Sequence, residues 1–490
     1  MIKNYITILL LIFIGSQVAA QNDAAKEFAA TISEEDLKAR LSILASDKME
    51  GRETGEPGQK RAAKYIRKQF KKFGLKPVVE VDGKKSYYQT FNLYRTLNRE
   101  VYIKASGQQF NIIDDIVFFG SGNTTGEVNS EAVFLGEGSS IPADLDLTGK
   151  VAVLVNKGRS WRSAVGTATK KGASASIVMF AETEDAFQQS LKRMAGFMRS
   201  GRLSRTAPEK EDNRFTFLVG PAMIEKLFGM DMVSLKEKEF SAKAPVTINV
   251  DRGAETVPTE NVLGFLEGTD LKDEILVITS HYDHIGTNGE DVNNGADDDG
   301  SGTTTVLELA QAFTKAKAKK QGPRRSILFM TVTGEEKGLM GSDYYTKNPV
   351  FPLENTVTNL NIDMVGRVDP DHEDKGDYVY VIGSDKLSSE LHEISEKANE
   401  QSVNIDLDYK YNDENDPNRF YYRSDHYNFA KNNIPIIFYF NGVHADYHKP
   451  TDTIEKINFP MMQKRASLVF YTAWELVNRN DRVVVDKGGS

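Results

Sequence analysis

From residue 261 onward, the sequence alternates between apolar runs of strand length and stretches with a helical pattern of apolar residues. In the clearest helical stretch, 301–318, Val306, Leu309, Ala310 and Phe313 follow the i, i+3, i+4, i+7 spacing of one helix face. Strands that are apolar along their whole length, alternating with amphipathic helices, are typical of a mainly parallel sheet with both faces covered. We therefore expect an α/β fold with a mainly parallel, mixed sheet flanked by helices. The apolar runs are at residues 275–280, 326–332, 360–363, 378–383 and 434–440.

The preceding residues have a different organisation. Residues 33–76 show a helical pattern interrupted by the Gly-rich polar loop 51–58. Between about 110 and 250, short β-rich runs replace it, and residues 150–180 read as a strand, a helix and a second strand. We therefore expect a discontinuous main domain at 21–111 and 251–490, interrupted by a smaller β-rich domain at 112–250.

The N-terminus has the pattern of an export signal. Lys3 precedes an apolar core at 6–14, and small residues at 18–20 precede Gln21. No later run approaches the ~20 apolar residues that cross a bilayer. We expect residues 1–20 to be a signal peptide of a bacterial protein that is periplasmic or secreted, with no stable membrane anchor after its removal.

Composition excludes several kinds of site. The net charge of −9 argues against nucleic acid as a partner, since such binding depends on neutralising phosphates. The chain has no cysteine, which excludes disulfides, thiol nucleophiles and Cys-ligated zinc. Any metal ion must be held by His, Asp and Glu.

Residue types that bind metals follow four of the predicted strands. Sites in open α/β sheets form beyond the carboxyl ends of the strands, so these side chains are expected to meet at one edge. They are His281 after 275–280, Glu335 and Glu336 after 326–332, Asp363 at the end of 360–363, and His448 after 434–440.

A Gly-flanked run of three aspartates, 297–299, lies between the first two of these strands. Three adjacent carboxylates repel one another in a partly buried loop, and a cation would remove that repulsion. The alternative is an exposed acidic loop that caps the next helix.

Such a mixed N/O ligand set suits zinc, cobalt or manganese. Two divalent ions bring a charge of +4 and three carboxylates bring −3, so the residual charge favours a hydroxide bridging the metals. Of Glu335 and Glu336, we expect one to bind metal and the other to act as general base and acid. Asp283, two residues after His281, is placed to orient that imidazole.

Six segments, together with residues 49–77, resemble the M28 family of zinc aminopeptidases. The resemblance covers about 27–110 and 255–475, and residues of roughly 112–250 resemble, more weakly, the protease-associated domain often inserted there. The fold implied is that of the phosphorylase/hydrolase-like zinc peptidases. The segments are SHYDHIG (280–286), GADDDGSG (295–302), TGEEKGLMGS (333–342), NIDMVGR (361–367), RSDHYNF (423–429) and YHKPTDT (447–453).

The resemblance implies two Zn²⁺ ions, with Co²⁺ or Mn²⁺ as substitutes. It implies that His281 and Asp363 hold one ion and that Glu336 and His448 hold the other. Asp298 bridges both, and its peptide bond to Asp299 is expected to be cis.

The resemblance also implies roles in catalysis. Glu335 matches the general base, Asp283 the orienting carboxylate, and Tyr447 a tyrosine that in some relatives bonds to the tetrahedral intermediate. The expected function is release of N-terminal residues from peptides. The alternatives are a carboxypeptidase, a glutaminyl cyclase of the same fold with one zinc, and a non-catalytic peptide-binding protein.

Other candidate residues receive structural interpretations. His426 is expected to pack or to support the site, and His284 and His444 are expected to be loop residues and not ligands. Arg367 and Arg423 are expected to brace acidic groups.

Overall fold

A computed structural model describes residues 23–488 except 121, 157, 159–160, 201 and 208–214. The expected signal peptide lies outside the described residues. The chain divides into two compact units: the main unit is Met1–Phe91 with Pro258–Ser490, and the inserted unit is Asn92–Val257. None of the described helices has the length and apolar character needed to span a bilayer.

The sequence placed the domain boundaries at 111/112 and 250/251, and the compact units instead divide at 91/92 and 257/258. A long strand runs across each division: β3 (Tyr88–Ala105) crosses the first and β11 (Lys243–Leu266) crosses the second. Because each of these strands continues past the division, the composition of the sequence does not change at the residue where one core ends. The boundary therefore could not be located from the sequence. That the inserted unit is a protease-associated domain stays a prediction.

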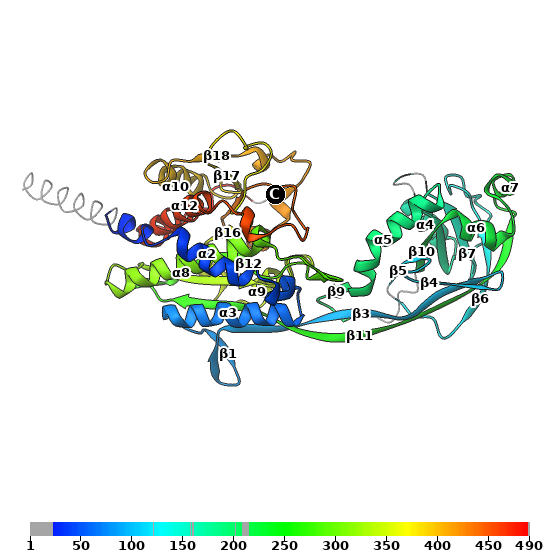
Figure 1. Cartoon of the computed structure of the whole chain (residues 1–490), viewed down its shortest axis with the longest axis horizontal. Helices are drawn as coiled ribbons and strands as arrows, with labels where there is room; N and C mark the ends of the chain where they lie inside the picture. The colour runs from blue at the N-terminus through cyan, green and yellow to red at the C-terminus, as the bar shows by residue number, and fades with distance from the viewer. Residues whose placement is uncertain are drawn as a thin grey trace, which may run out of the picture. The chain divides into compact units, whose positions relative to one another are not determined.

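The sheet of the main unit runs in the order β18-β17-β19-β16-β12-β15-β11. Its central strands, β15, β12, β16 and β19, are parallel neighbours, and β11 and β17 join them antiparallel (Figure 1). This is the mixed, mainly parallel sheet that the apolar runs predict. The bounds are β12 (Leu271–His281), β15 (Arg325–Val332), β16 (Thr356–Ile362), β17 (Tyr378–Ile382), β18 (Asp406–Asp408) and β19 (Ile436–Phe440).

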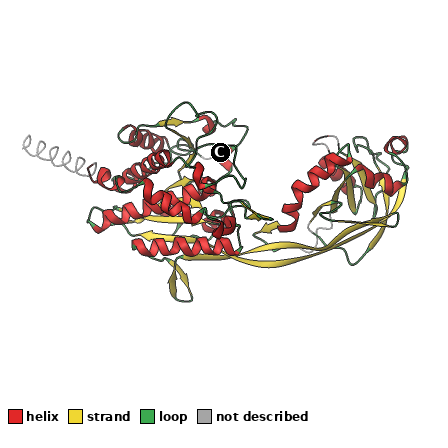
Figure 2. Cartoon of the chain, viewed as in Figure 1, coloured by secondary structure: helices red, strands yellow, loops and turns green. Residues whose placement is uncertain are grey.

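Helices cover both faces of this sheet (Figure 2). Alternate residues of β12 enter different cores: Leu276 and Ile278 pack into the larger one, and Ile275 and Val277 into the smaller. The larger core is covered by α2 (Glu34–Leu44), α3 (Pro57–Phe73), α8 (Gly302–Ala318), α10 (Ser389–Glu400) and α12 (Phe459–Asn478), and the smaller by α9 (Met340–Lys347) and α11 (His426–Ala430).

In the inserted unit, β6, β7, β8 and β10 are parallel neighbours, and β5 and β11 pair with them antiparallel at either end. The strand–helix–strand pattern expected at 150–180 is confirmed as β7, α4 and β8. The strands are β4 (Gln108–Asn111), β5 (Val117–Gly120), β6 (Val128–Phe134), β7 (Val151–Val155), β8 (Ala175–Met179), β9 (Arg202–Ser204) and β10 (Phe215–Val219). The helices are α4 (Trp161–Lys170), α5 (Glu184–Ser200), α6 (Pro221–Phe228) and α7 (Met232–Glu237).

Candidate metal centre and active site

The parallel strands deliver the expected side chains to one edge of the main sheet. β12 ends at His281, Glu335 and Glu336 follow β15, and Asp363 follows β16. In register, His281 lies opposite the last residue of β15, so the carboxyl ends of these neighbours coincide. His448 is in the loop after β19. The structure therefore brings all of the predicted strand-end residues together.

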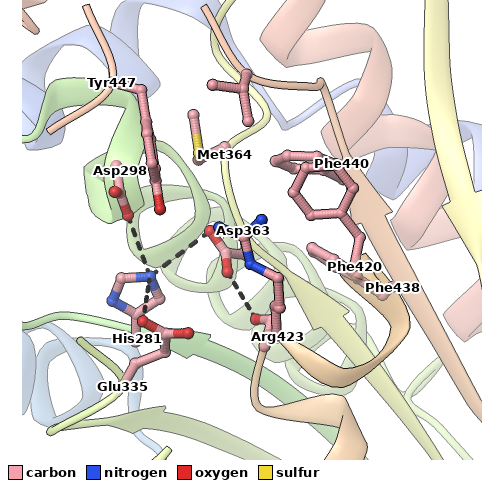
Figure 3. A pocket seen from close by; sticks show the side chains of 12 residues that line it. His281, Asp298, Glu335, Asp363, Met364, Phe420, Arg423, Phe438, Phe440 and Tyr447 are labelled. Atoms are coloured by element: carbon pink, nitrogen blue, oxygen red, sulfur yellow. Dashed lines mark hydrogen bonds and ion pairs between the residues drawn. The ribbon is translucent and has the colours of Figure 1, made fainter. Parts of the chain in front are cut away.

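One group of ligand-type atoms surrounds His281 (Figure 3). Its Nε2 lies 3.3 Å from Asp298 Oδ1, 3.6 Å from Asp363 Oδ1 and 3.9 Å from Glu335 Oε2. His281, Glu335 and Asp363 form one of two described clusters whose atoms could hold a metal ion.

A second group surrounds Glu336. His448 Nε2 lies 3.1 Å from both Glu336 Oε2 and Asp298 Oδ2. His284 Nδ1 lies 2.8 Å from the other Glu336 oxygen, Oε1, and 3.8 Å from Asp298 Oδ2. His284, Asp298 and Glu336 form the second cluster able to hold an ion.

Asp298 is shared between the two groups through different oxygens, Oδ1 toward His281 and Oδ2 toward His448. Donors ~2.0–2.2 Å from a zinc ion at tetrahedral angles lie roughly 3.3–3.6 Å from one another. The His281 Nε2 distances of 3.3 and 3.6 Å match that spacing and exceed an ordinary N–H···O bond. The donors around His281 therefore fit a metal ion better than a network of hydrogen bonds.

The charges of the two groups are strongly coupled. Burial alone would lower the pKa of His281, but the charges of Glu335 and Asp363 raise it well above its usual value. Burial would raise the pKa of Asp298, but His284, His281 and His448 hold it well below its usual range. A concentration of negative charge this strong attracts cations.

Glu335 and Glu336 differ in their surroundings. Burial, with the charges of Glu336 and Asp363, raises the pKa of Glu335 well above its usual range despite the opposing effect of His281. Burial and Asp298 would also raise the pKa of Glu336, but hydrogen bonds from His284 and His448 lower it to about 2. The surroundings thus shift the pKa values of these two neighbouring carboxylates in opposite directions.

Asp283 lies beside His281, but its carboxylate is not the atom within hydrogen-bond distance. His281 Nδ1 is 3.1 Å from the main-chain carbonyl of Asp283 and 3.8 Å from its carboxylate. The carboxylate instead accepts from Thr54 Oγ1 at 2.7 Å and from the main-chain N–H of Glu335 at 3.3 Å. Asp283 therefore ties the loop after β12 to the loop that carries Glu335.

Two further groups fix the acidic side chains. Ser424 donates to Asp363 Oδ2 at 2.6 Å and leaves Oδ1 facing His281. Asp299 accepts from main-chain N–H groups at 281, 302 and 364, so its carboxylate is occupied by the backbone. The Asp298–Asp299 peptide bond is cis, as the resemblance implied.

Arg52, fully buried, links the loops that carry the site. Its guanidinium donates to five main-chain carbonyls, those of residues 44, 282, 294, 295 and 298. From the sequence, residues 51–58 were predicted only to form a Gly-rich polar loop, with no role for Arg52. The one signal that could have singled out Arg52 and Thr54 is the resemblance of residues 49–77 to the family's opening segment.

The other histidines have distinct positions. His284, expected to be a loop residue, is fully buried in the second group. His444 faces Asp297 at 3.1 Å and is not in either group. His426 stacks on Phe438 and bonds to a main-chain carbonyl, which is the packing role expected.

A pocket opens on the first group. Arg423 and Tyr447 line it, and the hydroxyl end of Tyr447 points toward the carboxylates (Figure 3). Burial and the nearby charges of Asp298 and Glu336 raise the pKa of that hydroxyl. Arg367, by contrast, pairs with Asp446 at 3.0 Å and braces the loop of His448. The apolar wall of the pocket consists of Met364, Phe420, Phe438, Phe440 and Val443.

Residues 261–473, which include every residue of both groups, match the model of peptidase family M28. The match covers less than half of the chain, and over these residues the chain is similar to peptidase family M28.

The chain is similar to the aminopeptidase YwaD of Bacillus subtilis, with 28% identity over 232 residues, 46% of each chain. A probable zinc metalloprotease of Pyrenophora tritici-repentis is 31% identical over 180 residues, 33% of this chain and 35% of the other. The matched part thus spans less than half the length of either relative.

Among solved structures, the aminopeptidase from Aneurinibacillus sp. strain AM-1 superposes with a TM-score of 0.61 at 22% identity, over 95% of this chain and 98% of the other. The zinc aminopeptidase BSAP of Bacillus subtilis gives 0.55 at 20% identity, over 93% and 98%. These likenesses show that the chain shares their fold.

Proposed function

We propose that the protein is a two-zinc aminopeptidase that releases N-terminal residues from peptides. The observation that carries the proposal is that the two carboxylate oxygens of Asp298 face two different groups of donors, one around His281 and one around Glu336. His281 and Asp363 would hold one ion, Glu336 and His448 the other. The relatives named aminopeptidase or zinc metalloprotease support this assignment.

Bound zinc supplies Lewis acidity toward the scissile carbonyl and makes water ionise near neutral pH. Residues of the chain perform the remaining work. Tyr447, on the pocket wall, donates its hydroxyl to the oxygen on which negative charge develops. Ser424 and Asp299 hold the loops that carry Asp363 and Asp298 in place.

Glu335 is the residue we assign to proton transfer. Both oxygens of Glu336 are engaged by histidines, at 2.8 and 3.1 Å. The carboxylate of Glu335 accepts no hydrogen bond from the described residues, its nearest charged partner being His281 at 3.9 Å, and it lines the pocket. Glu335 is therefore free to take a proton from the attacking water and give it to the leaving amine.

The apolar wall of the pocket indicates the substrate. Three phenylalanines, Met364 and Val443 favour an apolar side chain on the residue that is released. Leucyl and phenylalanyl chromogenic amides should be cleaved faster than glutamyl or lysyl ones. Faster cleavage of the glutamyl amide would mean that Arg423 selects the substrate; cleavage of N-blocked peptides only would refute the aminopeptidase proposal.

The adjacent glutamates supply a matched test. Glu335→Gln should keep both zinc ions and lose about 10²–10⁴-fold in kcat, because a proton acceptor is removed and the ligands stay. Glu336→Gln should lose zinc as well as activity. Zinc content by mass spectrometry, together with initial rates, distinguishes the two variants. A Glu335→Gln enzyme with wild-type kcat would refute the assignment of Glu335 to proton transfer.

We further propose that the protein is exported and acts in the periplasm or outside the cell. The charged start, apolar core and small residues of segment 1–20 support this. Fractionating cells that express the full chain tests it: the mature N-terminus should begin near Gln21 in the exported fraction.

A further inference from the structure

His284 has no role in the ligand set above, yet it is 0% exposed inside the second group. Its Nδ1 lies 2.8 Å from Glu336 Oε1, and its Nε2 has no hydrogen-bond partner among the described residues. Burying an imidazole with only one of its two nitrogens hydrogen-bonded costs free energy, so the position of His284 calls for an explanation.

Several features hold this ring in one orientation. The main-chain N–H of His284 donates to the carbonyl of Arg52 at 3.2 Å. A Cβ at Gly295 would lie 2.6 Å from the ring, so glycine is needed to leave room for it. The ring of His448 meets it edge-on, with centroids 5.7 Å apart. The imidazole is therefore fixed before any ion arrives.

His448 Nε2 lies 3.1 Å from one oxygen of each of two carboxylates, Glu336 and Asp298, whereas His284 Nδ1 is close to Glu336 alone. An N–H···O bond is about 2.7–3.2 Å long. The 2.8 Å from His284 Nδ1 to Glu336 Oε1 is a hydrogen bond, and 3.8 Å to Asp298 Oδ2 is too long for one. The other oxygen, Glu336 Oε2, faces His448.

We infer that His284 is a positioning residue for the second metal site: it donates its Nδ1–H to Glu336 Oε1, so that Glu336 presents Oε2 alone to the cation. The inference rests on the proposed two-zinc function and adds a residue to it. Second-sphere partners of this kind typically contribute 10–100-fold to metal affinity.

Two substitutions separate the hydrogen bond from the space that the ring fills. His284→Asn retains an N–H donor near the position of Nδ1 but leaves space unfilled. His284→Leu fills the space and has no donor. His392→Leu is the control, since His392 lies in α10, hydrogen-bonds to Ser384 and packs on the ring of Tyr409, and belongs to neither group.

The measurement is a titration of the metal-free full chain with zinc against a chromophoric chelator, with folding checked by circular dichroism. Wild type and His392→Leu should bind two ions. His284→Leu should bind one ion with unchanged affinity and the second with Kd raised about 10–100-fold, and His284→Asn should lie close to wild type.

Each other outcome overturns the inference. Unchanged affinities in His284→Leu mean that the residue has no such role. A second ion that His284→Leu cannot bind at any concentration makes His284 a ligand, and a loss in His284→Asn with wild-type binding in His284→Leu makes it a packing residue. A wild-type chain that binds no zinc would instead refute the proposed function.

Discussion

The three aspartates at 297–299 show how adjacent identical residues take different roles. Asp299 is occupied by main-chain N–H groups, and burial raises its pKa well above its usual range. Asp297 bonds to main-chain and hydroxyl donors and faces a histidine of the neighbouring loop. Only Asp298 directs its two oxygens to His281 and His448.

The sequence could place ligand types at strand ends, because strand periodicity and chain order fix which residue follows each strand. It could not choose among the three aspartates, since spacing carries no information about where each carboxylate points in a turn. His284 was missed for the same reason: it is one of two histidines three positions apart, and only the fold shows that both are buried at the site.

An exposed pair gives a pH prediction. Hydrogen bonds from Arg324 lower the pKa of Asp270 to about 2. Since the folded-state pKa is depressed, the stabilisation is present above the unfolded value of ~3.9 and is lost as pH falls through about 2. Asp270→Asn should cost roughly 0.2–1 kcal/mol at pH 7, because the pair is largely exposed, and progressively less from pH 4 downward.

Urea midpoints at pH 7, 4 and 3 provide the measurement. Asp273→Asn is the matched control, since Asp273 is an exposed acid at the start of the same strand, β12. A deficit in Asp270→Asn that stays constant over this range would contradict the pair's contribution.

At the scale of elements, α2 is joined to α8 by a buried ion pair. Arg40 contacts Glu308, which is 0% exposed in the middle of α8, and also donates to Gln311. Burial lowers the pKa of Arg40, opposed by Asp36. A buried carboxylate of this kind depends on its partner, because it has lost its water.

Arg40→Met should therefore destabilise the main unit by about 3–5 kcal/mol, since it leaves Glu308 uncompensated. The double variant Arg40→Met/Glu308→Leu should recover most of that loss, because both charges are gone. Chemical denaturation of both variants measures this, and equal losses would show that the charge is not the cause.

The elements that periodicity predicts best are those inside one core. The apolar runs of β12, β15 and β19 and the amphipathic face of α8 were placed correctly, since burial on both faces, or along one helix stripe, leaves a clear pattern. β3 and β11 were not foreseen as continuous strands. Their partners change along their length, so no single period describes them.

The whole molecule contains separate cores in its two units, and each unit holds one of the two tryptophans. Trp161 is in α4 of the inserted unit and Trp474 in α12 of the main unit. Both are at least nine-tenths buried, at 8% and 6% exposure, so each reports the melting of its own core.

A chelator should destabilise one unit only. Each zinc ion at 100 times its Kd adds about 2.7 kcal/mol to the unit that binds it, so removing both of the proposed ions should lower its Tm by roughly 10 °C. In Trp161→Phe the remaining fluorescence should show this drop on chelation, and in Trp474→Phe it should not. A drop of equal size in both variants would mean that the units unfold together.

The link made by Arg52 has a consequence for the order in which the proposed metal site is assembled. In chain order, Arg52 precedes all of the proposed ligands and His448 follows them. During synthesis, the residue that joins the loops is therefore present before the complete ligand set. The second of the proposed ions can be held only after the loop that follows β19 has been made, and a chain truncated before that loop should hold the first ion alone.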